Sequence, residues 1–188
     1  IVDSVNASLG DATATAETIE RSIGIAVKNW LELGRALDDA CLLQHVALQE
    51  VPDQDRLKML QDMERLVAHA ETAPVTAATL RLEEWKGVTA LKSQAQSMYL
   101  GPGVLQSLVD TVTKSIRIGV PSDGAVDNAV EEWQRVDDAV ELEARNRNIA
   151  ESERQRFSFL PWLLARSRTS EELHALVVEA MDAWQGRQ

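Results

Sequence analysis

The stretch IERSIGIAVKNWLELGRALDDA, residues 19–40, decides the fold of this 188-residue chain. Its apolar side chains recur at alternating spacings of four and three residues, at Ile19, Ile23, Ala26, Trp30, Leu33, Leu37 and Ala40. Such a heptad pattern places them along one stripe of an α-helix. Asp11 can cap the start of this helix, and Pro52 ends it. The sequence therefore predicts one long N-terminal helix over about 12–50.

Helical periodicity continues through the rest of the chain, and no segment shows the alternation of a β-strand. Caps and breakers predict five further helices: 54–70, 74–98, 102–118, a fifth that begins at Ser122 or Asp123 and loses its apolar stripe over 145–156, and a sixth that follows the TSEE capping box at 169–172. The helix over 54–70 is expected to bury Leu57, Leu60, Met63 and Val67. The helix over 102–118 is expected to bury Leu105, Leu108, Val112 and Ile116. Short connections favour antiparallel neighbours. The predicted fold is all-α, an elongated antiparallel bundle of about six helices.

The domain organisation follows from the same pattern. Residues 1–10 are predicted to be a flexible tail, and residues 11–188 a single helical-bundle domain. The stretch GPG at 101–103 is where a boundary between sub-bundles would fall. The chain starts at Ile1 rather than Met, which fits a fragment or subunit of something larger.

Composition narrows the function classes. The formal net charge is −11, and an acidic chain is repelled by nucleic acid and by anionic lipid unless its positive charges are gathered in one place. The single cysteine rules out a disulfide within the chain. No signal peptide and no apolar run long enough for a membrane span are visible. We therefore expect no nucleic-acid partner and no membrane contact, and these features favour an intracellular location.

Candidate catalytic groups are few. Cys41 and His45 are four residues apart and could share a helix face near the acidic pair at 38–39, but a zinc site needs at least three protein ligands. Glu171 and His174 form an E-x-x-H motif, of which a di-iron bundle needs two. The acidic pair at 38–39 would also raise the pKa of a Cys41 thiol and weaken it as a nucleophile. The sequence predicts no catalytic residue, no metal and no cofactor, and hence no enzyme.

The segment 145–168 differs most from the rest of the chain. It carries six arginines against two glutamates, and it contains FSFLPWLL at 157–164, the densest apolar run. Three interpretations compete: a crossover whose apolar residues pin a short helix to the bundle, a docking site for an acidic or helical partner, and an interfacial contact with membrane or nucleic acid. If the segment is functional, the expected partner-binding residues are Arg154, Arg156, Phe159, Trp162 and Arg166.

Four tryptophans end similar motifs: AVKNW (26–30), RLEEW (81–85), AVEEW (129–133) and AMDAW (180–184). Each falls on the apolar stripe of its own helix. Trp30, Trp85, Trp133 and Trp184 are therefore predicted to be core anchors, with the indole N–H near a rim where it can find an acceptor. The similarity of 26–40 to 129–139 could reflect duplication, although repeated use of one amphipathic pattern explains it as well.

Taken together, these patterns predict a non-enzymatic helical module for protein–protein interaction or scaffolding, with a protein partner or self-association. The alternative is a ligand-sensing helical bundle, such as the extracytoplasmic domain of a receptor. It would bind a small molecule between its helices, with tryptophans lining the pocket.

Overall fold

The computed structural model describes residues 16–70, 72–98, 100–101, 103–154, 157–166 and 169–186. These residues are 83% helical with no strand, and their helices pack antiparallel, which confirms the predicted all-α fold with a long N-terminal helix. The predicted tail over 1–10 lies outside the described residues. None of the helices in this part of the chain is both long and apolar enough to cross a membrane.

The chain divides into two compact units, Ile1–Trp85 and Lys86–Gln188, and each is described by itself. The division falls inside helix α4 (Pro74–Ala95), whereas the sequence pointed to 101–103. A single domain over 11–188 stays a prediction.

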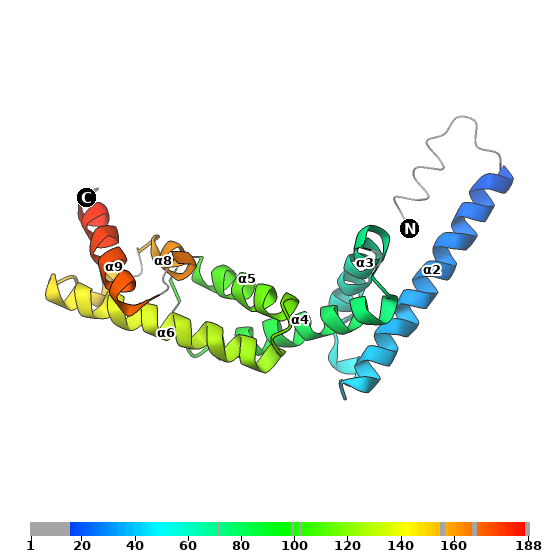
Figure 1. Ribbon diagram of the computed structural model, residues 1–188, viewed down its shortest axis with the longest axis horizontal. Helices are drawn as coiled ribbons and strands as arrows, with labels where there is room; N and C mark the ends of the chain where they lie inside the picture. Colours follow the sequence, from blue (N-terminus) through cyan, green and yellow to red (C-terminus); the bar gives the residue numbers. More distant parts are fainter. Residues whose placement is uncertain are drawn as a thin grey trace. The chain divides into compact units, whose positions relative to one another are not determined.

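Unit 1 contains α2 (Ala16–Leu43), the 3₁₀ turn η1 (Leu48–Glu50), α3 (Asp53–Ala70) and the first half of α4 (Figure 1). α2 and α3 form a hairpin closed by the turn. The apolar core takes Leu33, Leu37 and Ala40 from the predicted heptad stripe, and adds Ala36, Cys41, Val51, Met59, Met63, Ala77, Ala78 and Leu82. The predicted stripe of α2 therefore builds this core in its C-terminal half.

Unit 2 contains the second half of α4 and five further helices: α5 (Val104–Arg117), α6 (Ser122–Asn146), α7 (Glu151–Arg154), α8 (Leu160–Arg166) and α9 (Ser170–Gln185). α6 is its longest helix and packs against α5, α8 and α9. The buried side chains include Leu108, Val112, Ile116, Val126, Trp133, Val136, Val140, Leu173, Val177 and Met181.

α4 passes close to α5 at Gly87. A Cβ atom at this position would lie 2.9 Å from Ile116 Cδ1 and 3.0 Å from Val112 Cγ1. Glycine is unfavourable in the interior of a helix, so its presence inside α4 needs an explanation. The close approach of α5 provides it. The missing side chain lets the two helices approach.

Two predicted helices are too long, and both end in the same way. α2 ends at Leu43 rather than near residue 50, because His45 turns into the left-handed region (φ 56°) and the Val46 N–H donates to the carbonyl of Cys41 at 2.9 Å. α6 ends at Asn146, with Asn148 in the same conformation (φ 54°). Both are Schellman ends, which usually carry glycine at the left-handed position. His and Asn gave no stop signal, so both endpoints were predicted too late.

Three inward-facing predictions are wrong. Ile23 on α2 is 43% exposed, Leu57 on α3 is 49% exposed and Leu105 on α5 is 37% exposed. On α3 the structure buries Met59, which was not predicted, whereas on α5 the other predicted side chains are buried: Leu108, Val112 and Ile116.

The four motif tryptophans fall into two groups. Trp133 and Trp184 are buried, as predicted for core anchors. Trp85 is half-buried, and its indole N–H donates to Asp55 Oδ2 at 3.0 Å, which is the rim arrangement that the sequence predicts. Trp30 is also half-buried, but its N–H is enclosed with no acceptor among the described residues.

Candidate functional site

Helix α8 is attached to unit 2 by the two phenylalanines that precede it. Phe157 is fully buried, and its ring stacks on Phe159 with centroids 4.9 Å apart. The same ring meets the edge of Trp184 on α9, again at 4.9 Å. Aromatic pairs in these geometries add to the stability that burial provides. The run FSFLPWLL thus packs α8 onto its unit, as the crossover interpretation expects.

The glycines at 101 and 103 make room for α8. A Cβ at Gly101 would lie 2.7 Å from Leu160 Cδ1, and one at Gly103 would lie 3.2 Å from Pro161 Cγ. Gly103 also has a positive φ of 76°, which L-residues rarely adopt. The first turn of α8 therefore rests directly on this backbone.

The exposed side of α8 carries a paired tryptophan and arginine. Trp162 and Arg166 are one helical turn apart, and the guanidinium carbon of Arg166 lies 4.9 Å from the centroid of the Trp162 ring. This is a cation–π contact, which limits the freedom of the arginine while leaving its N–H groups available. Arg166 is exposed and Trp162 is half-buried.

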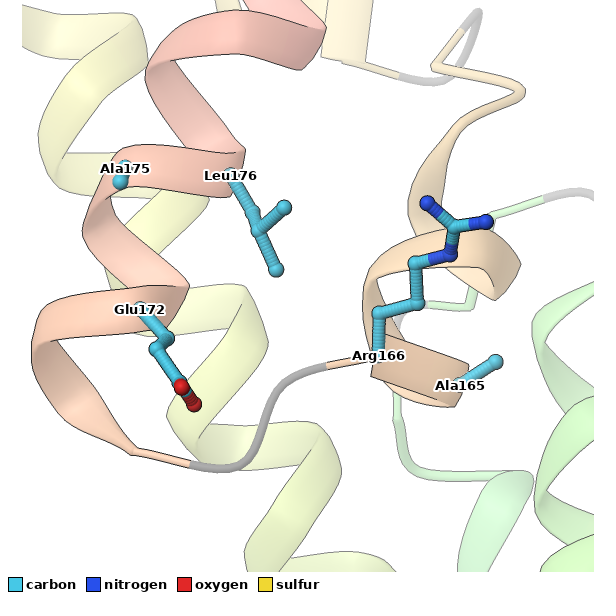
Figure 2. Close-up of a pocket in the computed structure, with 5 residues that line it drawn as sticks. All are labelled: Ala165, Arg166, Glu172, Ala175 and Leu176. Carbon is cyan, nitrogen blue, oxygen red and sulfur yellow. The ribbon is translucent and has the colours of Figure 1, made fainter.

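A groove lies beside this pair, between α8 and α9 (Figure 2). Its volume is about 500 Å³, and it is lined by Ala165, Arg166, Glu172, Ala175 and Leu176. Figure 2 shows Leu176 and Glu172 projecting from α9 toward the space beside α8. The groove offers small apolar surfaces together with one positive and one negative side chain.

Glu172 is oriented by the predicted capping box. Its backbone N–H donates to Thr169 Oγ1 at 3.2 Å, and its Oε2 accepts from the Thr169 N–H at 3.1 Å. Both bonds satisfy groups at the start of α9 that have no partner inside the helix. A residue that the sequence assigned only to helix capping thus also forms a wall of the groove.

The structure brings only part of the predicted site together. Arg166 and Trp162 are in contact on α8, and Phe159, which precedes the helix, is buried at 8% exposure. Arg154 is the last residue of α7, but its side chain lies outside the described part, as does Arg156 altogether. Partner binding by these five residues stays a prediction.

The sequence did not predict the ionic network that joins α6 to α9. Arg147 donates from Nε to Glu143 Oε1 at 2.6 Å and from Nη1 to Asp182 Oδ1, also at 2.6 Å. A further bond of 2.9 Å reaches Gln185 Oε1. The i,i+4 spacing of Glu143 and Arg147 is visible in the sequence, but their proximity to α9 is not.

The candidate catalytic groups do not come together. His45 follows the end of α2, so it does not share a helix face with Cys41 as its spacing suggested. The Cys41 thiol is buried, and desolvation together with the charge of Asp38 raises its pKa. Across the described ranges, no three His, Cys, Asp or Glu side chains form a group that could hold a metal ion.

Comparison of the chain with protein-family models, with curated proteins and with solved structures gives no match.

Proposed function

We propose that this chain is a non-enzymatic helical module that binds a protein partner, and that the α8–α9 groove receives an acidic, amphipathic segment of that partner. The observation that carries this proposal is the exposed Arg166 held over Trp162 at the edge of an apolar groove. Arginine and tryptophan are enriched among the residues that dominate binding energy at protein interfaces.

Charge and shape support an acidic partner. Arg166 is exposed, and an exposed guanidinium can bind a carboxylate in a bidentate manner. Ala165, Ala175 and Leu176 leave space beside it for an apolar side chain. Glu172 on the opposite wall disfavours a second negative group there, so the partner's acidic residue is expected at the α8 side.

A second candidate is the sensing of a small molecule in the same groove. Its volume falls within the range of roughly 300–1,000 Å³ that is typical of ligand sites. Arg166 and Glu172 could hold a ligand that carries both a carboxylate and an amine. All five lining residues belong to α8 and α9, and the groove between these helices is open to solvent. An open groove favours a peptide segment over a small ligand that the protein would have to enclose.

Fluorescence anisotropy tests the proposal with two labelled peptides that share one apolar helical face and differ in the sign of the opposite face. We expect the acidic peptide to bind the native chain and the basic peptide to bind at least about tenfold more weakly. Arg166→Glu should reverse this preference without lowering the melting temperature. Arg145→Glu, at an exposed arginine of α6 outside the groove lining, is the matched control and should leave the preference intact.

Equal binding of the two peptides, or a preference that survives Arg166→Glu, would show that the groove is not the docking site. A thermal-shift screen with amino acids and small carboxylates tests the second candidate. A stabilising ligand that loses its effect in Arg166→Glu, combined with no peptide binding, would favour the sensor.

A further inference from the structure

The α8–α9 groove carries one charge on each wall. Arg166 on α8 and Glu172 on α9 are both exposed, and both line the groove. No ion pair joins them in the described part of the chain, and Figure 2 shows them on opposite walls with Leu176 projecting toward the space between. Two opposite charges that do not neutralise each other can each bind an oppositely charged group of a partner.

Glu172 is held in place with part of its hydrogen-bonding capacity unused. Its Oε2 accepts from the Thr169 N–H at 3.1 Å, which fixes the carboxylate at the start of α9. An ionised carboxylate can accept at both oxygens, and within the described ranges Oε1 receives no hydrogen bond. A charged group that is already fixed loses less conformational freedom when it binds a partner.

The capping role of Glu172 does not require its charge. A glutamine at this position can also close a capping box, because its side-chain oxygen accepts from the same N–H. The start of a helix does favour an acidic residue, but its partial positive charge is only about half a unit and leaves this wall negative. The charge of Glu172 can therefore be removed while the cap is retained.

The other charges of the two helices do not offset this arrangement. Arg166 is the only charged residue of α8. Four further charged residues of α9 do not line the groove: Glu171, His174, Glu179 and Asp182. The helix turns Glu171 and His174 toward other directions, and Asp182 is bonded to Arg147. Glu179 follows Glu172 by two helical turns on the same side of α9, so it adds negative charge to this wall.

We propose that Glu172 is a second recognition residue of the groove, and that the partner segment presents a basic side chain to Glu172 together with an acidic side chain to Arg166. This inference rests on the proposed function, because it describes the segment that the groove receives. It adds a requirement for one basic residue on the flank that faces α9. The partner is then defined by two opposite charges on either side of an apolar residue.

A helical segment can present such a pair from neighbouring positions. Successive residues of an α-helix are turned by about 100°, so the residues directly before and after an apolar residue lie on its two flanks. With the apolar side chain in the groove, one flank faces α8 and the other faces α9. The orders acid–apolar–base and base–apolar–acid both satisfy the groove, because the segment can lie in either direction. The requirement is therefore that the two charges lie on opposite flanks.

Two labelled peptides of identical composition test this inference by fluorescence anisotropy. They share one apolar face. In the opposite-flank peptide the acid and the base lie on different flanks, and in the same-flank peptide they lie four residues apart on one flank. The native chain should bind the opposite-flank peptide about three- to fivefold more tightly at low salt, which is the effect of one exposed ion pair. Circular dichroism checks that the two peptides have equal helix content.

Glu172→Gln is the deciding variant, because it removes the charge and keeps the capping box. It should bring the ratio of the two dissociation constants to about one. Glu171→Gln is the matched control, since it removes an equal charge from the same helical turn at a residue outside the groove lining. It should leave the ratio unchanged. A ratio near one in the native chain, or a ratio that persists in Glu172→Gln, would overturn the inference.

A reversal of preference gives a test that a loss of folding cannot imitate. A third peptide carries an acid on each flank of the same apolar face. The native chain should bind this peptide more weakly than the opposite-flank peptide, and Glu172→Lys should bind it more tightly. If Glu172→Lys keeps the native order, Glu172 does not face the bound segment.

The outcomes separate this inference from the proposed function. If the two peptides of identical composition bind the native chain equally and Arg166→Glu weakens both, the groove is a docking site and only the role of Glu172 is wrong. If no peptide binds at concentrations up to about 1 mM, both proposals fail.

Discussion

Arg147 Nη1 donates a hydrogen bond of 2.6 Å to Oδ1 of Asp182, and this bond joins the end of α6 to α9. The same guanidinium donates to Glu143 Oε1, whose side chain is only 12% exposed. A carboxylate with so little access to water needs a charged partner to compensate for the free energy of its lost hydration. Arg147 therefore stabilises both the position of α9 and the ionised form of Glu143.

Replacing Arg147 should destabilise the protein more than replacing a comparable surface arginine. We expect Arg147→Met to lower the free energy of unfolding by about 2–3 kcal/mol, because it leaves Glu143 largely buried without its donor. Arg145→Met removes an exposed i,i+4 pair with Glu141 and should cost about 0.3–0.5 kcal/mol. Urea unfolding followed by circular dichroism measures both. Equal losses would show that the α6–α9 network contributes no more than a surface pair.

The same network predicts how stability changes with pH. The hydrogen bond from Arg147 is the main cause that lowers the pKa of Glu143, with smaller effects from Asn146 and His174. A carboxyl group with a lowered pKa in the folded state adds stability above its unfolded pKa of about 4.3, and this is lost as the pH falls through the folded pKa. The difference between native protein and Arg147→Met should therefore be full at pH 7 and shrink below about pH 4. A difference that stays constant down to pH 3 would contradict this coupling.

Two half-buried tryptophans should respond differently to the same substitution. Trp85→Phe removes the N–H that bonds to Asp55, whereas Trp30→Phe removes an enclosed N–H with no acceptor in the described part of the chain. Both changes lose similar ring area, so we expect Trp85→Phe to cost about 1–2 kcal/mol more than Trp30→Phe. Chemical denaturation of both variants gives the comparison. If Trp30→Phe costs the same or more, its N–H has an acceptor in solution.

Two glycines in unit 2 should respond with opposite signs to alanine. Gly87→Ala places a methyl group 2.9 Å from Ile116 Cδ1, so the α4–α5 contact must shift, and we expect a loss of about 1–3 kcal/mol. Gly124→Ala in α6 meets only Val120 Cγ1 at 3.7 Å, an ordinary contact. It should gain up to about 1 kcal/mol from helix propensity. Melting temperatures by differential scanning calorimetry distinguish the two, and a gain at both sites would mean that α4 and α5 are not closely packed.

Much of the fold could be predicted because it depends on neighbours in sequence. The heptad spacing around Trp30 and the capping box of Thr169 and Glu172 are local patterns, and both have the predicted local structure. The ends of α2 and α6 were missed because His45 and Asn148 take a conformation that glycine adopts far more easily.

The candidate site was only partly predictable for a different reason. Trp162 and Arg166 are one turn apart, so their contact was accessible from the sequence. Ala175 and Leu176 form the other wall of the groove and lie on α9. No local sequence pattern indicates that α9 packs beside α8, so this wall could not be predicted.

By itself, the sequence determined that this chain is helical, where most helices begin, and which residues form the stripe of each helix, because the 3.6-residue period and the caps act over one or two turns. Only the tertiary structure decided which side of each stripe is covered. It buries Met59 rather than Leu57, links Arg147 to Asp182 across two helices, and leaves Ile23, Val27 and Leu31 of α2 exposed. Burial and pairing of this kind depend on residues far apart in the chain, which no local pattern specifies.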